Sequence, residues 1–115
     1  MASPERGVRT TPDGHHLVID GRRWRATDPV LPEELLAPLR SELGRARSRI
    51  RVTRDEEQVA ALRGRVQLAK EGLGERGQPW WEMTESERLR RAMEALEKLE
   101  GPGDRGDQDR AADQR

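Results

Sequence analysis

The sequence contains no cysteine, no phenylalanine and no tyrosine, and only two of its 22 basic residues are lysines. Without cysteine the chain can form neither a disulfide nor a thiolate nucleophile, and it cannot bind zinc or an iron–sulfur cluster through sulfur. It has no run of roughly 18 apolar residues that could span a membrane, and no secretory leader. We therefore expect a soluble, cytoplasmic protein that does not bind membranes.

The composition allows only a small core. The 115 residues are 32% hydrophobic and 38% charged, which indicates a single domain. Because phenylalanine and tyrosine are missing, we expect Trp24, Trp80 and Trp81 to be structural anchors. The formal net charge is zero, which argues against a dedicated nucleic-acid-binding protein. Positive charge is nevertheless concentrated in residues 29–54, which hold six arginines and three glutamates.

Both ends of the chain are polar and lack periodicity. Residues 1–13 contain two prolines, and residues 101–115 contain no large apolar side chain. Neither segment buries enough apolar surface to offset the entropy lost on ordering, so we predict a disordered arm and a disordered tail. The single predicted domain spans residues 14–100.

The domain begins with a predicted β-hairpin over residues 15–26. Its turn is Asp20-Gly21, a pair that suits the positive φ angles of a type I′ turn. Alternation of side chains places Leu17, Ile19 and Trp24 on one face, which we expect to be buried. Arg23 and Arg25 then point to the other face. An isolated hairpin is only marginally stable, so this one must pack against other elements.

Two helices are predicted next, over residues 32–52 and 54–72. Their apolar residues recur at alternating intervals of three and four, which is a heptad pattern and indicates an antiparallel helical hairpin. These positions are Leu36, Leu39, Leu43, Ala46 and Ile50 in the first helix and Val59, Leu62, Val66, Ala69 and Leu73 in the second. Arginines alternate with smaller residues over 45–52, which also fits a strand, but the heptad continues through them and favours a helix.

A third helix is predicted over residues 85–100. Gly72, Gly74 and Gly77 end the second helix and lead into a turn over residues 73–83. Capping boxes are predicted at Thr53–Glu56 and Thr84–Glu87. The third helix should bury a stripe of Leu89, Met93, Leu96 and Leu99. The predicted fold is thus α+β and mainly α: an N-terminal β-hairpin packed on an antiparallel helical hairpin, with a third C-terminal helix.

Two blocks of the sequence carry a resemblance to a known group of proteins. They are HHLVIDGRRWRATDP, residues 15–29, and LGERGQPWWE, residues 73–82. In these blocks the chain resembles small uncharacterised bacterial proteins, some of which are labelled "biopolymer transporter Tol". The resemblance implies that both blocks belong to one domain. It implies no catalytic or binding residue.

The arginines are the main candidates for a functional surface. Arginine side chains on a helix can bind consecutive phosphates of a nucleic-acid backbone, and a hairpin could extend such a patch. The alternative is a solvated face that is neutralised by acidic residues of the second and third helices, namely Asp55, Glu56, Glu57, Glu71, Glu94 and Glu97. The candidate phosphate or partner contacts are Arg23, Arg25, Arg40, Arg45, Arg47, Arg49, Arg51 and Arg54.

Other motifs predict no chemistry. His15 and His16 are adjacent in a strand and therefore point to opposite faces, and no third ligand has a metal-site spacing. Residues 72–77 are rich in glycine but lack the lysine and hydroxyl of a phosphate-binding loop, so they indicate a helix cap and a turn. Trp80 and Trp81 could offer an exposed platform for a ligand, but burial of at least one is the favoured interpretation. No catalytic residue, cofactor, metal or small-molecule substrate is predicted.

We therefore expect a binding or assembly module without enzymatic activity. Its favoured role is interaction with a protein partner or with a second copy of itself, since short heptad seams and a few tryptophan anchors make a marginal monomer. A two-fold dimer through the third helix or the heptad seams is the concrete form of this hypothesis. The alternative is an accessory protein that binds nucleic acid through the arginine-rich helix face.

Overall fold

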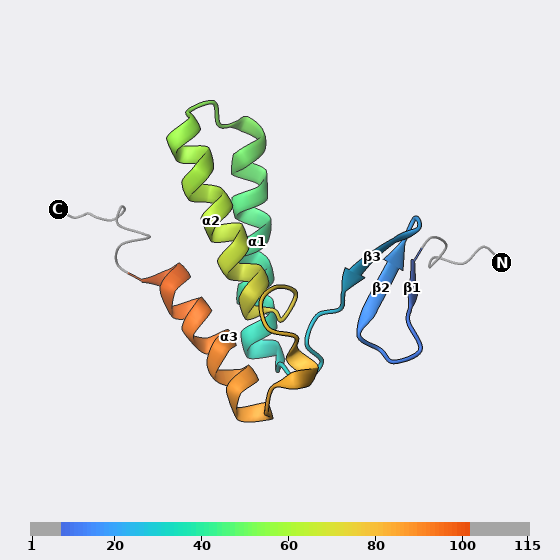
Figure 1. Ribbon diagram of the computed structural model, residues 1–115. Helices are drawn as coiled ribbons and strands as arrows, with labels where there is room; N and C mark the ends of the chain where they lie inside the picture. The colour runs from blue at the N-terminus through green and yellow to red at the C-terminus, as the bar shows by residue number, and fades with distance from the viewer. Residues whose placement is uncertain (1–7, 102–115) are drawn as a thin grey trace.

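The computed structural model describes residues 8–101, which form a small antiparallel sheet beside a group of three helices (Figure 1). The fold is α+β and mainly α, as predicted. A short 3-10 helix, η1 (Trp80–Glu82), precedes the last helix. The other elements, in chain order, are β1 (Val8–Thr10), β2 (His16–Ile19), β3 (Arg22–Arg25), α1 (Glu33–Val52), α2 (Glu56–Gly72) and α3 (Glu85–Glu100).

The predicted hairpin is confirmed as strands β2 and β3. Asp20 and Gly21 both have positive φ angles, 51° and 83°, as a type I′ turn requires. The antiparallel register pairs Leu17 with Trp24 and Ile19 with Arg22. These pairs lie on one face of the sheet, because residues directly opposite each other point the same way.

The expected disordered arm is wrong for residues 8–13. Val8–Thr10 forms strand β1, which pairs antiparallel with β2 and makes a sheet of three strands in the order β1-β2-β3. The connection is held by Asp13, whose carboxylate accepts hydrogen bonds from the Thr11 hydroxyl at 2.7 Å and the His15 amide at 3.0 Å. The backbone N–H and C=O groups on the edge of β2 that faces away from β3 thereby gain hydrogen-bond partners. Residues 1–7 of the arm and 102–115 of the tail lie outside the described residues.

The heptad seams of the two long helices are confirmed. Leu39, Leu43 and Ala46 of α1 are buried, as are Leu62 and Ala69 of α2. The two helices lie antiparallel, side by side in Figure 1. Pro38 lies inside α1, which begins at Glu33.

One of the two predicted capping boxes is present. At the start of α3 the Thr84 hydroxyl accepts from the Glu87 amide at 3.1 Å, and the Glu87 carboxylate accepts from the Thr84 amide at 2.9 Å. The box predicted at Thr53–Glu56 is wrong, because α2 starts two residues later than expected, after Asp55. The Thr53 hydroxyl instead donates to the carbonyl of Arg49 in the last turn of α1.

Helix α2 ends in the predicted glycine cap. The Gly74 amide donates to the Glu71 carbonyl at 3.1 Å and the Glu75 amide to the Lys70 carbonyl at 2.9 Å, which together form a Schellman motif. Gly74 has a φ of 84°, and a Cβ atom there would lie 2.8 Å from the Cβ of Asp28. Only glycine fits this position without a shift of the backbone.

The predicted stripe of helix α3 is confirmed for Leu99, which is buried, and for Leu89 and Leu96, which are partly buried against the core. It is wrong for Met93, which is 53% exposed, and Ala92 and Ala95 are buried instead. The reason is close approach: a Cβ atom on Gly72 of α2 would lie 2.8 Å from the Cβ of Ala95. Only small side chains fit where the two helices come this close. Ala92 and Ala95 therefore point inward, and Met93 points outward.

The sheet lies beside the turn between α2 and α3 instead of along the helix faces (Figure 1). Three contacts carry this arrangement. Trp80 Nε1 donates to the Ala26 carbonyl at 2.9 Å, Arg25 Nη1 donates to the Gly77 carbonyl at 2.7 Å, and the rings of His15 and Trp81 stack with centroids 3.9 Å apart.

The three tryptophans have different environments. Trp80 is 7% exposed and is confirmed as an anchor, and Trp81 is half-buried against His15. The prediction that Trp24 is buried is wrong, because this side chain is 40% exposed. Its face of the sheet is not covered by a helix; the Arg22 guanidinium lies 4.6 Å and the Lys70 ammonium 5.9 Å from its ring centroid.

These environments predict unequal effects of truncation. Trp80→Ala should lower the free energy of unfolding by about 3–5 kcal/mol, since it removes a buried ring and leaves the Ala26 carbonyl without its donor. Trp24→Ala should cost about 1 kcal/mol or less, because its ring is partly in water already. Urea denaturation followed by circular dichroism measures both, and a larger loss for Trp24→Ala than for Trp80→Ala would contradict the structure.

Candidate functional site

The five arginines of α1 and Arg54, which follows the end of this helix, are all exposed, but they do not form one face. Intervals of seven and four residues place Arg40, Arg47 and Arg51 on one side of the helix. Arg45 and Arg49 lie about 140–180° around the axis from this stripe. The predicted patch is therefore divided between two sides of α1.

The acidic residues that were expected to neutralise these arginines do not pair with them. Arg45 pairs with Glu42 at 3.0 Å and Arg51 contacts the Ser48 hydroxyl at 3.4 Å, both within α1. Within residues 8–101, Arg40, Arg47, Arg49 and Arg54 form no ion pair or hydrogen bond through their side chains. Glu71, one of the expected partners, accepts instead from Gln67 at 2.8 Å.

The hairpin arginines lie on the face of the sheet that strand alternation predicts. Arg23 and Arg25 alternate with Trp24 and therefore lie on the opposite face of the sheet. Arg25 is engaged with the Gly77 carbonyl, and its guanidinium lies 5.8 Å from the Trp81 ring centroid. Arg23 and Arg25 thus point away from the side of the sheet on which Lys70 of α2 lies.

The cations beside the Trp24 ring were not among the predicted site residues. They are Arg22 of β3, 4.6 Å from the ring centroid, and Lys70 of α2, 5.9 Å from it. The pKa of Lys70 is lowered first by burial and then by the charges of Arg76 and Arg47, against a smaller opposing effect of Glu75. Strand alternation could have placed Arg22 beside Trp24, but no sequence pattern brings Lys70 to a strand 46 residues earlier.

A buried ion pair lies where the sheet and the three helices meet. The Asp28 carboxylate, 2% exposed, accepts from Arg88 Nη2 at 2.6 Å and Nε at 2.9 Å, and from the Val30 amide at 2.9 Å. The hydrogen bonds to Asp28 raise the pKa of Arg88, and the Trp80 ring centroid lies 5.1 Å from the guanidinium. The bidentate bond occupies both carboxylate oxygens. The pair therefore stabilises the fold, and Asp28 is not available as a general base.

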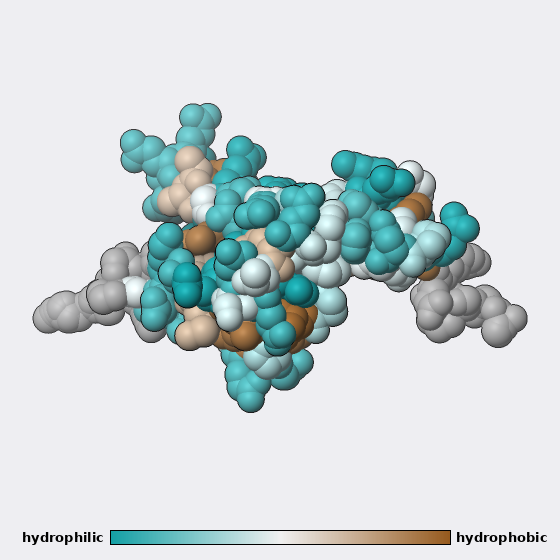
Figure 2. Space-filling view, turned by 60° about the horizontal axis from the view of Figure 1, so that its bottom comes forward, coloured by the Kyte–Doolittle hydropathy of each residue, from teal (hydrophilic) through white to brown (hydrophobic). Residues whose placement is uncertain are grey.

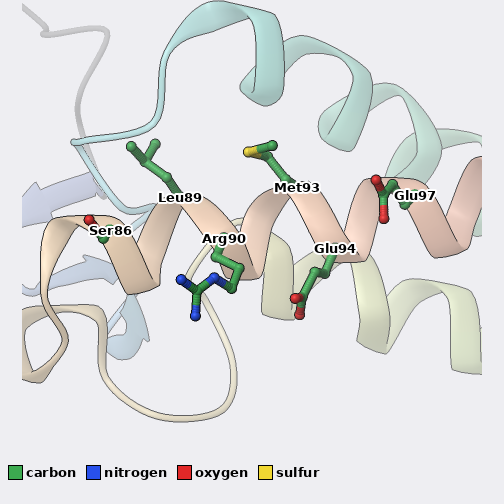
Figure 3. A pocket seen from close by; sticks show the side chains of 6 residues that line it. All are labelled: Ser86, Leu89, Arg90, Met93, Glu94 and Glu97. Atoms are coloured by element: carbon green, nitrogen blue, oxygen red, sulfur yellow. The ribbon is translucent and has the colours of Figure 1, made fainter.

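The outer face of α3 carries a shallow groove of about 520 Å³. Figure 3 shows Leu89 and Met93 along one edge of the helix and Arg90 and Glu94 along the other. Seen from below, the surface of the molecule is mostly hydrophilic, and apolar residues gather in a patch on its helical part (Figure 2). The groove is lined by Ser86, Leu89, Arg90, Met93, Glu94 and Glu97.

The two histidines contribute to the sheet contact. His15 stacks on Trp81 and its Nδ1 lies 3.3 Å from the Asp13 carboxylate, while the His16 ring meets Trp81 edge-on at 5.5 Å. No group of three or more histidine and acidic side chains that could hold a metal ion occurs between residues 8 and 101. Over the same range, no helix has the length and apolar character required to cross a bilayer.

Comparison of the chain with protein-family models, curated proteins and solved structures finds no match. The resemblance of the blocks at residues 15–29 and 73–82 to small bacterial proteins stays a prediction. In the structure these two blocks do contact each other, through Trp80 with Ala26 and His15 with Trp81.

The buried ion pair predicts a stability defect that a second substitution relieves. Arg88→Met leaves the Asp28 carboxylate buried without its cation, so it should lower the free energy of unfolding by about 3–5 kcal/mol. Asp28→Asn combined with Arg88→Met removes the buried charge and should recover part of this loss. Urea denaturation of both variants measures the difference; equal stability of Arg88→Met and the parent protein would refute the role of the pair.

Proposed function

We propose that the protein is an assembly module without enzymatic activity that forms a two-fold dimer through the outer face of α3. The observation that carries this proposal is an exposed methionine between two charges of opposite sign. Met93 is 53% exposed and lies between Arg90 and Glu97 along the helix. The two copies would use the same surface, as in most dimers of identical chains.

The apolar part of this surface is a stripe along one edge of α3. Leu89 and Leu96 are partly buried against the core, and Met93 projects further out between them. The inward residues Ala92, Ala95 and Leu99 are fully packed, so rotation of the helix cannot hide Met93. Methionine is well suited to a contact surface, because its unbranched side chain adapts to its partner.

The charges along the other edge support a second copy as the partner. Within residues 8–101, Arg90, Glu94 and Glu97 form no ion pair. Arg90 lies about one turn before Met93 and Glu97 about one turn after it. When two α3 helices pair antiparallel with Met93 at the centre, Arg90 of each copy lies near Glu97 of the other. The same operation places Leu89 beside Leu96.

The helix is held rigidly enough to present this surface. Its first turn is fixed by the Thr84 and Glu87 capping box and by the bidentate bond of Arg88 to Asp28. Little conformational entropy is therefore lost when a second helix binds. The surface is one helix wide, which indicates an interface below about 1,200 Å² and a weak, reversible dimer.

Charge reversal tests the pairing of Arg90 with Glu97. Arg90→Glu or Glu97→Arg alone should weaken the dimer at least about tenfold, because like charges then meet across the two-fold axis. The double variant with both changes restores opposite charges and should recover most of the affinity. Sedimentation equilibrium over a wide range of protein concentration measures the dissociation constants.

Two further variants complete the experiment. Met93→Glu should abolish the dimer, since it introduces charge at the centre of the apolar stripe. Arg49→Glu, an exposed charge change on α1, serves as the matched control and should leave the dissociation constant unchanged. A parent protein that stays monomeric up to millimolar concentration, or a double variant as weak as the single ones, would exclude this dimer.

A further inference from the structure

The exposed ring of Trp24 is contacted by two cations, Arg22 and Lys70, and the charges of two more, Arg76 and Arg47, act on Lys70. Arg22 is on the same strand, Lys70 on α2, Arg76 in the turn that follows, and Arg47 on α1. We call these five residues the Trp24 cluster. The Arg22 guanidinium lies 4.6 Å and Lys70 Nζ 5.9 Å from the ring centroid, so cations already contact the indole.

Lys70 lies close enough to two of the other cations for their charges to act on it. The charges of Arg76 and Arg47 both lower the pKa of Lys70, in addition to its burial. Glu75 acts in the opposite direction but is itself engaged, since its carboxylate accepts from the Thr27 hydroxyl at 2.7 Å. Between residues 8 and 101, none of the four cations forms an ion pair, and Arg76 donates only to the neutral Gln67 side chain.

The cluster lies on the face of the helical hairpin that α3 leaves uncovered. On α2, Arg65 donates to the Leu99 carbonyl of α3 and Gly72 approaches Ala95, which marks the covered side. Lys70 lies two residues from Gly72 and therefore about 160° around the helix from it. On α1, Arg40 and Arg51 share the side of Arg47 and extend the positive surface along the helix.

Unpaired cations next to an exposed tryptophan are the elements that bind single-stranded nucleic acid. Indole rings stack on unpaired bases, and arginine and lysine side chains bind the phosphates on either side. The Arg22 guanidinium lies 4.6 Å from the centroid of the Trp24 ring, so this ring is already within reach of a side chain that could bind an adjacent phosphate. We infer that the Trp24 cluster binds single-stranded nucleic acid, with a base stacked on Trp24 and adjacent phosphates bound by Arg22, Lys70 and Arg47.

A single strand fits this surface better than a duplex. A duplex hides the faces of its bases in the stack, so an indole ring that projects from a strand cannot reach them. The zero net charge of the chain leaves only local attraction, which acts over about 8 Å at physiological salt. Binding should therefore be moderate, insensitive to sequence and strongly dependent on salt. This inference goes beyond the proposed dimer, because it uses the opposite side of the helical layer.

The test is fluorescence anisotropy of a labelled oligothymidine of about 15 nucleotides at roughly 50 and 200 mM salt. Trp24→Ala should weaken binding about tenfold, whereas Trp24→Phe, which keeps a ring, should retain most of the affinity. Arg47→Ala and Lys70→Ala should each reduce the slope of log affinity against log salt by about 0.7. Circular dichroism melting confirms that each variant is folded.

Three controls separate stacking from general charge attraction. Arg49→Ala removes an unpaired charge from the opposite side of α1 and should leave the oligonucleotide affinity unchanged. Inorganic polyphosphate, which has no bases, should bind equally to the parent protein and to Trp24→Ala. The Arg90→Glu variant should bind the oligonucleotide as the parent does, so that failure of this site and failure of the dimer are distinguished.

Several results would overturn the inference. These are no binding of oligothymidine at about 50 mM salt, equal affinity of Trp24→Ala and the parent, and equal effects of Arg47→Ala and Arg49→Ala. Tighter binding of a blunt duplex than of the single strand would assign the surface to phosphate contacts alone. Quenching of tryptophan fluorescence by the oligonucleotide in the parent, but not in Trp24→Phe, would support it.

Discussion

The buried pair of Asp28 and Arg88 sets the position of every other element. Asp28 stands between the sheet and α1, and its amide donates to the Leu73 carbonyl at the end of α2 at 2.9 Å. Arg88 stands in the first full turn of α3, and Trp80 packs over its guanidinium. One residue therefore joins the segment after β3, the end of α2 and the start of α3: its amide bonds to Leu73 and its carboxylate to Arg88. A core poor in aromatic residues needs such a junction, because apolar burial alone does not fix the angle between the sheet and the helices.

The same junction determines which surfaces remain open. By holding the start of α3 at Asp28, it fixes the rotation of that helix, so Ala92 and Ala95 pack inward and Met93 faces outward. The junction also holds the turn after α2 against the residues that follow β3. The sheet therefore stays beside the helices, and Trp24 is left uncovered. The two proposed functions thus use opposite sides of one layer of helices, and neither surface competes with the other.

Much of this fold follows from local sequence patterns. The Asp20-Gly21 turn, the heptad seams, the glycine cap and the Thr84–Glu87 capping box each depend on residues close together in the chain, and each was predicted. Strand β1 was missed because three residues with polar neighbours carry no clear alternation; its pairing depends on the free edge of β2. The inward stripe of α3 was misplaced because hydrophobicity favours methionine over alanine, whereas the close approach of Gly72 to Ala95 demands a small side chain.

The candidate surfaces depended more on tertiary contacts and were predicted less completely. The arginines of α1 were identified, but their division between two sides of the helix emerged only with the neighbouring elements in place. The same holds for the lack, within residues 8–101, of an acidic partner for Arg40, Arg47, Arg49 and Arg51, whereas Arg45 pairs with Glu42. Trp24 was expected to be buried on the grounds of size, and Lys70 was overlooked, since the contact between them spans 46 residues. Ion pairs such as Asp28 with Arg88, 60 residues apart, leave no periodic signal in a single sequence.

Because the chain has no cysteine, a single introduced thiol can report directly on the proposed two-fold pairing of α3. In Met93→Cys the thiol lies at the centre of the proposed interface, where the same residue of two copies would meet within disulfide distance. Under mild oxidation, at a protein concentration at which the parent protein dimerises, we expect Met93→Cys to form a covalent dimer much faster than Arg49→Cys, whose thiol lies on the exposed side of α1. Equal rates of cross-linking for the two variants would contradict it.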